Sequence, residues 1–197
     1  MKKLISLTLL LLFLLSPVYA DALAEEAEES TLPAPGICVD EEGFCVSVGE
    51  FFDMLETLLT EDASPFFPGS TVSITRGNAS PEIRIVSVPP SDKLVLSASE
   101  AGRDAFPSDE ESFTLLVAMG PMDSDTNFLG MTVTATSMLY LCYPEVTDFS
   151  EALHLLSTLI ENAGIWVQDG AMEYQFAALG DGNVIFAIRE IAPYAEG

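Results

Sequence analysis

The segment from Asp148 to Gly164 carries the strongest secondary-structure signal in the chain, and it predicts an amphipathic helix. Its apolar residues recur at intervals of three and four, so that they share one helical face: Phe149, Ala152, Leu153, Leu156, Leu159, Ile160 and Ala163. Asp148 is expected to cap the first turn, with Glu151 returning the hydrogen bond. Gly164 is expected to end the helix, because glycine tolerates the left-handed conformation found there.

The same pattern occurs once before, starting at Ser47. Ser47 and Glu50 stand where Asp148 and Glu151 stand in the later segment. Seven apolar positions then align without a gap, and the earlier segment supplies Val48, Phe51, Phe52, Met54, Leu55, Leu58 and Leu59. We interpret the match as a hypothesis of tandem duplication, with pseudo-repeats 37–99 and 130–197. Any two amphipathic helices share a period, so chance agreement is the alternative.

Residues 1–20 are expected to be a secretory signal peptide. Lys2 and Lys3 form its basic start, an apolar run follows, and Ala20 ends a small-residue cleavage site. The apolar run is shorter than a membrane-spanning helix requires. The sequence therefore predicts an exported chain, extracellular or periplasmic, that is cleaved near Ala20 and has no membrane span in its mature form.

Acidic residues outnumber basic ones, 31 against 7. Removing Lys2 and Lys3 with the signal leaves five basic residues, so the net charge falls from −24 to −26. So few bases cannot form a phosphate-binding patch, which excludes nucleic acid as a partner. The same argument excludes an anionic membrane surface. The charge favours a cationic ligand or a basic protein surface as the partner, and the alternative is that it serves solubility alone.

The chain after the signal divides into a leader and one domain. Residues 21–36 are rich in Ala, Glu and Pro and are predicted to be a flexible acidic leader, whereas residues 37–197 are predicted to be the α+β domain. Cys38 and Cys45 flank a turn rich in Asp, Glu and Gly, which predicts a Cys38–Cys45 disulfide in an exported protein and leaves Cys142 unpaired. The rival pairing is Cys45 with Cys142.

Alternating apolar residues predict antiparallel strands between and after the two helices. The alternating positions are Val72 and Ile74; Ile83 and Ile85; Leu94, Leu96 and Ala98; Phe113, Leu115, Val117 and Met119; Tyr174 and Phe176; and Val184, Phe186 and Ile188. A short strand is also expected at residues 165–167. A longer strand is predicted over residues 131–143, with Thr132, Thr134 and Thr136 on its solvated face.

These elements predict an α+β fold, in which antiparallel sheet is covered by two amphipathic helices. A helix followed by a meander of strands resembles the cystatins in element order. The chain contains no cystatin inhibitory motif, so the resemblance implies nothing about activity.

No residue is assigned a catalytic, metal-binding or cofactor-binding role. His154 is the only histidine, and any Ser-His-Asp or Cys-His mechanism would have to use this ring on the polar face of a helix. The cysteines and His154 lack the paired spacing of a structural zinc site. Asp123, Asp125 and Asn127 resemble the start of a calcium loop, although Phe128 replaces its glycine. A weak calcium site at a hairpin tip is therefore kept as a hypothesis.

The lack of a catalytic constellation favours a non-catalytic binding module over an enzyme. The alternative hypothesis is a carboxylate-based extracellular hydrolase with two acids in a sheet-lined cleft. The positions of Glu82, Glu173 and Glu190, in or beside predicted strands, distinguish the two. A hydrolase needs two such acids to converge in one pocket with raised pKa values, whereas a binding module does not.

Overall fold

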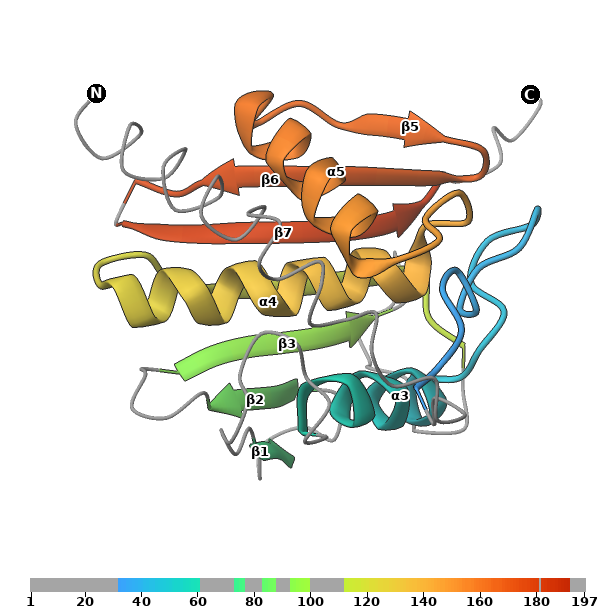
Figure 1. Ribbon diagram of the computed structural model, residues 1–197, viewed down its shortest axis with the longest axis horizontal. Helices are drawn as coiled ribbons and strands as arrows, with labels where there is room; N and C mark the ends of the chain where they lie inside the picture. Colours follow the sequence, from blue (N-terminus) through green and yellow to red (C-terminus); the bar gives the residue numbers. More distant parts are fainter. Residues whose placement is uncertain are drawn as a thin grey trace, which may run out of the picture.

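The computed structural model describes residues 32–60, 73–76, 83–87, 93–99, 112–180 and 182–191. These residues form a seven-stranded antiparallel sheet with helices against one face (Figure 1), which confirms the predicted α+β class. The helices are α3 (Val48–Thr60), α4 (Asp125–Cys142) and α5 (Phe149–Glu161). The strands are β1 (Ser73–Arg76), β2 (Ile83–Ser87), β3 (Lys93–Ser99), β4 (Leu115–Pro121), β5 (Val167–Asp169), β6 (Met172–Ala178) and β7 (Asn183–Glu190).

The strand order is β1-β2-β3-β4-β7-β6-β5. After α3 the chain enters the sheet at one edge and works inward from β1, and after α5 it enters at the other edge and works inward from β5. The two runs meet where β4 pairs with β7 in the centre of the sheet. In both runs a helix is followed by antiparallel strands, four after α3 and three after α5.

The core lies between the helices and one face of the sheet. Alternate residues of the central strands are buried there: Leu94, Leu96, Ala98, Leu116, Ala118, Met172, Tyr174, Phe176, Val184, Phe186 and Ile188. In β4, the residues that face the core are not the alternating residues that predicted this strand from the sequence. Leu116 and Ala118 face the core, and Met119, which alternates with them, is 40% exposed on the opposite face.

The two predicted amphipathic helices are confirmed as α3 and α5. Ser47 and Glu50 form the expected capping box, with Ser47 N donating to Glu50 Oε2 at 2.8 Å. Asp148 is the N-cap of α5 and accepts a hydrogen bond from Glu151 N at 2.9 Å. This helix ends at Glu161 rather than at the predicted glycine, and a turn follows it.

The strand predicted over residues 131–143 is wrong, because these residues belong to helix α4 and the turn after it. Every residue from Met131 to Cys142 is buried, including the threonines expected on a solvated face. Thr132 Oγ1 and Thr136 Oγ1 instead donate to main-chain oxygens one turn earlier in the helix, at 2.9 and 2.7 Å. The domain thus has a central helix that the sequence pattern did not predict.

The buried C-terminal end of α4 is held by the segment that precedes α3. The last carbonyls of a helix have no partner within it and must find donors elsewhere. Gly36 N donates to Tyr140 O at 2.8 Å, and Cys38 N donates to Leu141 O at 3.0 Å. Tyr174 Oη donates to Cys142 O at 2.8 Å. We call residues 32–47 the strap, since they bind across this helix end.

Several predictions lie outside the described residues. They are the signal at 1–20, most of the leader at 21–36, and the position of Glu82. Within the described ranges, no helix combines the length and the apolar character needed to cross a membrane.

Candidate functional site

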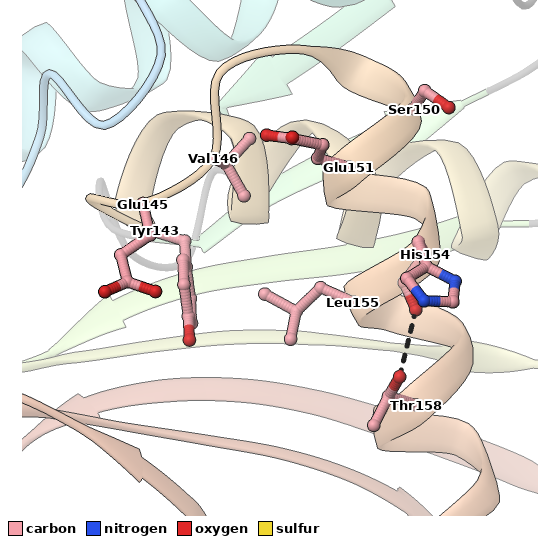
Figure 2. Close-up of a pocket in the computed structure, with 8 residues that line it drawn as sticks. All are labelled: Tyr143, Glu145, Val146, Ser150, Glu151, His154, Leu155 and Thr158. Carbon is pink, nitrogen blue, oxygen red and sulfur yellow. Dashed lines mark hydrogen bonds between the residues drawn. The ribbon is translucent and has the colours of Figure 1, made fainter.

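An open groove lies between α5 and the turn that connects it to α4. Its volume is about 500 Å³, and it is lined by Tyr143, Glu145, Val146, Ser150, Glu151, His154, Leu155 and Thr158. Figure 2 shows the Leu155 side chain pointing from the helix toward Tyr143 across this space. Tyr143, Val146 and Leu155 supply an apolar floor, while the carboxylates of Glu145 and Glu151 stand on the exposed sides.

Hydrogen bonds at the start of α5 fix one side of the groove. The Glu151 carboxylate accepts from Thr147 N at 2.8 Å and from Thr147 Oγ1 at 2.9 Å. These bonds, the backbone one first, lower the pKa of Glu151 below its usual value. The return bond of the predicted capping box therefore reaches Thr147 rather than Asp148. Glu151 stays ionised near neutral pH, so this side of the groove carries a fixed negative charge.

Tyr143 fixes the other side. Its ring lies against Tyr174, with 4.9 Å between the ring centroids. Burial, followed by the charge of Asp169, raises the pKa of Tyr143 to about 12. Asp169 Oδ2 is buried and has no hydrogen-bond partner among the described residues. Tyr143 is consequently a neutral, half-buried wall at physiological pH rather than a base.

The groove does not assemble a nucleophilic triad. Ser150 and His154 lie one turn apart on the exposed surface of α5. Glu151, the nearest acid along this helix, is occupied by its hydrogen bonds to Thr147. A histidine base must be oriented by a third group while it contacts the nucleophile, and this acid is engaged elsewhere. His154 thus contributes a polar, protonatable edge to the groove.

The acids proposed for a hydrolase do not converge in the part of the chain that the structure describes. Glu173 on β6 pairs with Arg189 on β7, with 2.6 Å between Oε2 and the guanidinium nitrogen. The Arg189 guanidinium also stacks 4.0 Å from the centre of the Trp166 ring. Glu190 accepts a hydrogen bond from Phe44 N at 2.8 Å, so it holds the strap. Neither glutamate lines the groove.

The predicted Cys38–Cys45 disulfide is not formed in this structure, where all three cysteines are free thiols. The hairpin expected between them is present, because Val39 bridges Phe44 and Cys45 N donates to Cys38 O at 3.0 Å. Cys38 and Cys142 are buried, whereas Cys45 is exposed. The Cys38–Cys45 pairing stays a prediction.

The segment proposed as a weak calcium site begins a helix rather than forming a hairpin tip. Ser124 caps α4 and accepts from Asn127 N at 3.2 Å. Asp123 Oδ1 accepts from Asn127 Nδ2 at 2.7 Å. In the described ranges, no three His, Cys, Asp or Glu side chains are grouped so as to hold a metal ion.

Sequence reasoning did not find the groove. The pattern predicts Tyr143 at the end of a strand, and it raises His154 only as a catalytic base or a zinc ligand. The available signal was the turn at Pro144-Glu145 directly before a capped helix, which predicts two elements meeting at an angle. Comparisons with known protein families, with curated proteins and with solved structures find no match.

Proposed function

We propose that this protein is an exported, non-catalytic binding module whose groove beside α5 takes a basic peptide segment of another protein. The observation that carries the proposal is the composition of the groove. An apolar floor of Tyr143, Val146 and Leu155 lies between two glutamates, and His154 is the only lining residue that can become positive. Lysine and arginine suit such a site, because their aliphatic stems cover apolar surface while their charged ends meet carboxylates.

The charge of the whole chain supports the same choice of partner. A net charge of −24 attracts cations from a distance and raises the rate of encounter with a basic segment. The attraction is screened by salt, since the Debye length falls from roughly 10 Å at 0.1 M to about 3 Å at 1 M. Binding of this kind should weaken steadily as salt rises.

The hydrolase alternative receives less support. Glu173 and Glu190 are each engaged in a separate structural contact, and the groove glutamate with a shifted pKa, Glu151, is shifted downward. A general acid needs a raised pKa instead. Release of product from a glycan or peptide panel, abolished by changing one carboxylate, would favour the hydrolase.

The test is an equilibrium titration with a labelled peptide that alternates lysine or arginine with serine. Binding is followed by fluorescence anisotropy at about 0.1 M and about 1 M salt. Glu145→Gln removes one charge from the groove, and it should weaken binding about two- to five-fold, as expected of an exposed ion pair. Glu161→Gln is the matched control, because it removes the same charge from an exposed position on α5 outside the groove.

Equal effects of the two variants would assign binding to general charge rather than to the groove. Undiminished binding at molar salt would point to an apolar contact and against a charge-driven partner. No binding at low salt would leave solubility as the role of the acidic excess.

The repeated helix pattern is a separate proposal, that of tandem duplication. In support, most paired positions have the same burial in α3 and α5: Phe51 with Ala152, Phe52 with Leu153, Leu55 with Leu156, Leu58 with Leu159, and Met54 with Leu155. Both helices also pack on α4. An experimental structure in which α3 and the three strands after it superpose on α5 and its three strands would support duplication. Different sheet partners for the two helices would contradict it.

A further inference from the structure

The strap brings Cys38 beside the last residue of α4. Two main-chain hydrogen bonds, from Gly36 N to Tyr140 O and from Cys38 N to Leu141 O, align the strap with the end of the helix. Cys142 is the next residue of that helix. Neither cysteine is exposed to any measurable extent, at 0% each. Two thiols that are distant in sequence are thereby buried in the same part of the core.

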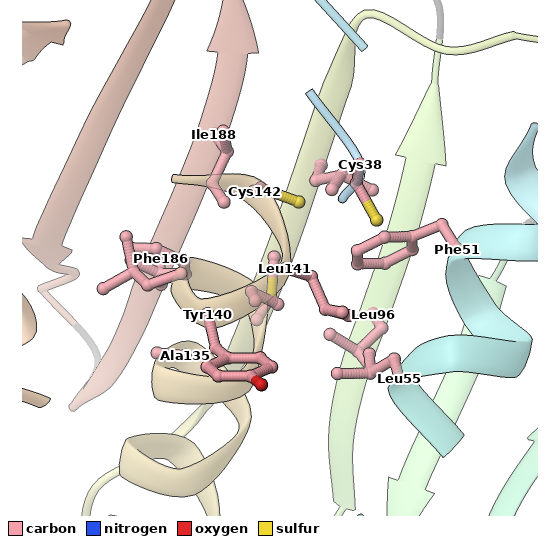
Figure 3. Close-up of a cluster of buried hydrophobic side chains, with 14 of the residues drawn as sticks. Cys38, Phe51, Leu55, Leu96, Ala135, Tyr140, Leu141, Cys142, Phe186 and Ile188 are labelled. Atoms are coloured by element: carbon pink, nitrogen blue, oxygen red, sulfur yellow. The ribbon is translucent and has the colours of Figure 1, made fainter. Parts of the chain in front are cut away.

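The two side chains also face each other. Figure 3 shows the sulfur atoms of Cys38 and Cys142 directed into the same space, beside Phe51 and Ile188. Burial first, and then the neighbouring Cys38, raise the pKa of Cys142 well above its usual value. A thiol pair in this apolar setting is well placed to become a neutral, compact disulfide.

Cys45 is placed differently, although it lies opposite Cys38 in the small hairpin. Its Sγ is exposed and lies 3.4 Å from Ile37 O, toward which it directs its hydrogen. Pairing it with Cys38 would require the buried thiol to turn outward. Pairing it with Cys142 would require an exposed thiol to enter the core.

We propose that Cys38 and Cys142 form the disulfide of the exported protein, with Cys45 as its free thiol. The inference rests on the export that is part of the proposed function, because disulfides form and persist in oxidising compartments. The oxidant is a disulfide-bearing molecule, either a thiol oxidoreductase or oxidised glutathione. One protein thiolate attacks the oxidant's disulfide and releases a thiolate, and the second protein thiolate then displaces the other half. Two protein thiols lose two protons and two electrons, and the oxidant becomes two thiols.

The bond would fasten the strap to the end of α4 covalently, in addition to the hydrogen bonds and core packing that hold it. It would close a loop of roughly 100 residues, which restricts the unfolded chain more than a bond across the short Cys38–Cys45 turn. The bond adjoins Tyr143, so it would also fix the wall of the groove.

Peptide mapping of the full chain tests the pairing. Purified protein is equilibrated in a mixture of reduced and oxidised glutathione, its free thiols are alkylated under denaturing conditions, and a protease that cleaves after glutamate separates Cys38 from Cys45 at Glu41-Glu42. The expected result is a reducible link between the peptides of Cys38 and Cys142, with Cys45 alkylated. Links of Cys45 to either partner, or three alkylated cysteines, would overturn the proposal.

Two variants keep the result independent of folding defects. Cys45→Ser alters an exposed thiol, so the link between Cys38 and Cys142 should still form. The thermal unfolding midpoint of this variant should still fall when the protein is reduced. Cys142→Ser should abolish the link and that sensitivity to reduction, and retention of either would contradict the assignment. Peptide binding is measured with fully reduced protein, so the pairing and the proposed function can fail separately. Three free thiols in protein recovered from its own compartment, together with the link formed in glutathione, would count against export.

Discussion

Thr134 is buried in α4, and its hydroxyl lacks the kind of hydrogen bond that Thr132 and Thr136 form. Thr132 and Thr136 donate their hydroxyls to main-chain oxygens one turn earlier, at 2.9 and 2.7 Å. Thr134 is fully buried, and its Oγ1 has no partner among the described residues. Removing a hydroxyl from water costs free energy, and without a hydrogen bond in the folded protein nothing offsets that cost.

Thr134→Val should therefore stabilise the protein. Valine has the same shape and removes the uncompensated hydroxyl, so we expect the free energy of unfolding to rise by about 1 kcal/mol. Thr136→Val is the matched control, because it deletes a hydroxyl that is bonded and should lower stability by about 1 kcal/mol. Denaturant unfolding measures both. Destabilisation by both variants would contradict the unpartnered hydroxyl.

The buried tyrosines should make the fold sensitive to alkali. Burial is the main cause that raises the pKa of Tyr143 to about 12, and it also raises the pKa values of Tyr140 and Tyr174. The unfolded chain releases these protons near pH 10. Stability should then be fully present below about pH 10 and be lost as the pH rises toward about 12.

Urea unfolding between about pH 8 and 12 measures this loss. Tyr143→Phe removes the contribution of the groove tyrosine, so the decline should be shallower in the variant. The same slope in both proteins would show that Tyr143 titrates normally.

At the scale of elements, the helix caps account for how α3 and α5 begin. Asp148→Ala removes the side chain that accepts from Glu151 N, and it should lower the free energy of unfolding by about 1 kcal/mol. Asp148→Asn keeps an acceptor oxygen and serves as the control. Equal losses would show that charge near the helix start, rather than the capping bond, sets the effect.

The helix caps should also weaken in acid. Hydrogen bonds from Ser47 lower the pKa of Glu50, and those from Thr147 lower the pKa of Glu151, in each case with the backbone bond as the larger cause. Their contribution is present above the unfolded pKa of about 4.3 and is lost as the pH falls through the lower folded value. Hydrogen exchange at the first turns of α3 and α5 should rise below about pH 4. Unchanged protection there would contradict the capping role.

Helix α4 shows why one element was predicted wrongly while its neighbours were not. When a helix is buried on one side only, its apolar residues recur with a period of about 3.6 residues, so the sequence pattern predicts the helix. Helix α5 is of this kind. Helix α4 is buried on every side from Met131 to Cys142, so no polar face marks its period. Thr132, Thr134 and Thr136 alternate and are β-branched, which imitates a strand. Tertiary packing therefore overrides local propensity here.

The central position of α4 predicts a large cost for removing its core side chains. Leu139 is fully buried, and Leu139→Ala should lower the free energy of unfolding by about 2–5 kcal/mol, because it leaves a cavity. Ile165→Ala is the control, since Ile165 is 59% exposed and the change should have little effect. Similar small losses at the two positions would mean that α4 is not central to the core.

For the whole molecule, local patterns predict the sheet and the two outer helices, but not the contacts between distant segments. Strands β3, β6 and β7 follow from the alternation that ends in Ala98, Phe176 and Ile188. The approach of Cys38 to Cys142 depends on the strap crossing the end of α4, and nothing near either cysteine signals it. The groove likewise arises only when α5 packs beside Tyr143.

The acidic excess makes a prediction at the same scale. At a net charge of −24 the compact state repels itself, so the unfolding midpoint should rise between about 0.1 M and about 1 M salt. Stabilisation well beyond this relief would indicate adaptation to salt, against which the 49% content of apolar residues argues. Equal midpoints would contradict a role of self-repulsion.

The central claim is that the groove beside α5 binds a basic peptide segment, and mapping chemical shifts by NMR tests it most directly. Isotope-labelled protein is titrated with the lysine- and arginine-containing peptide at low salt. We expect the perturbed amides to cluster in residues 143–158, with little change at the acidic turn of Asp40, Glu41 and Glu42. Shifts centred on that turn, or spread evenly over the acidic surface, would contradict the claim.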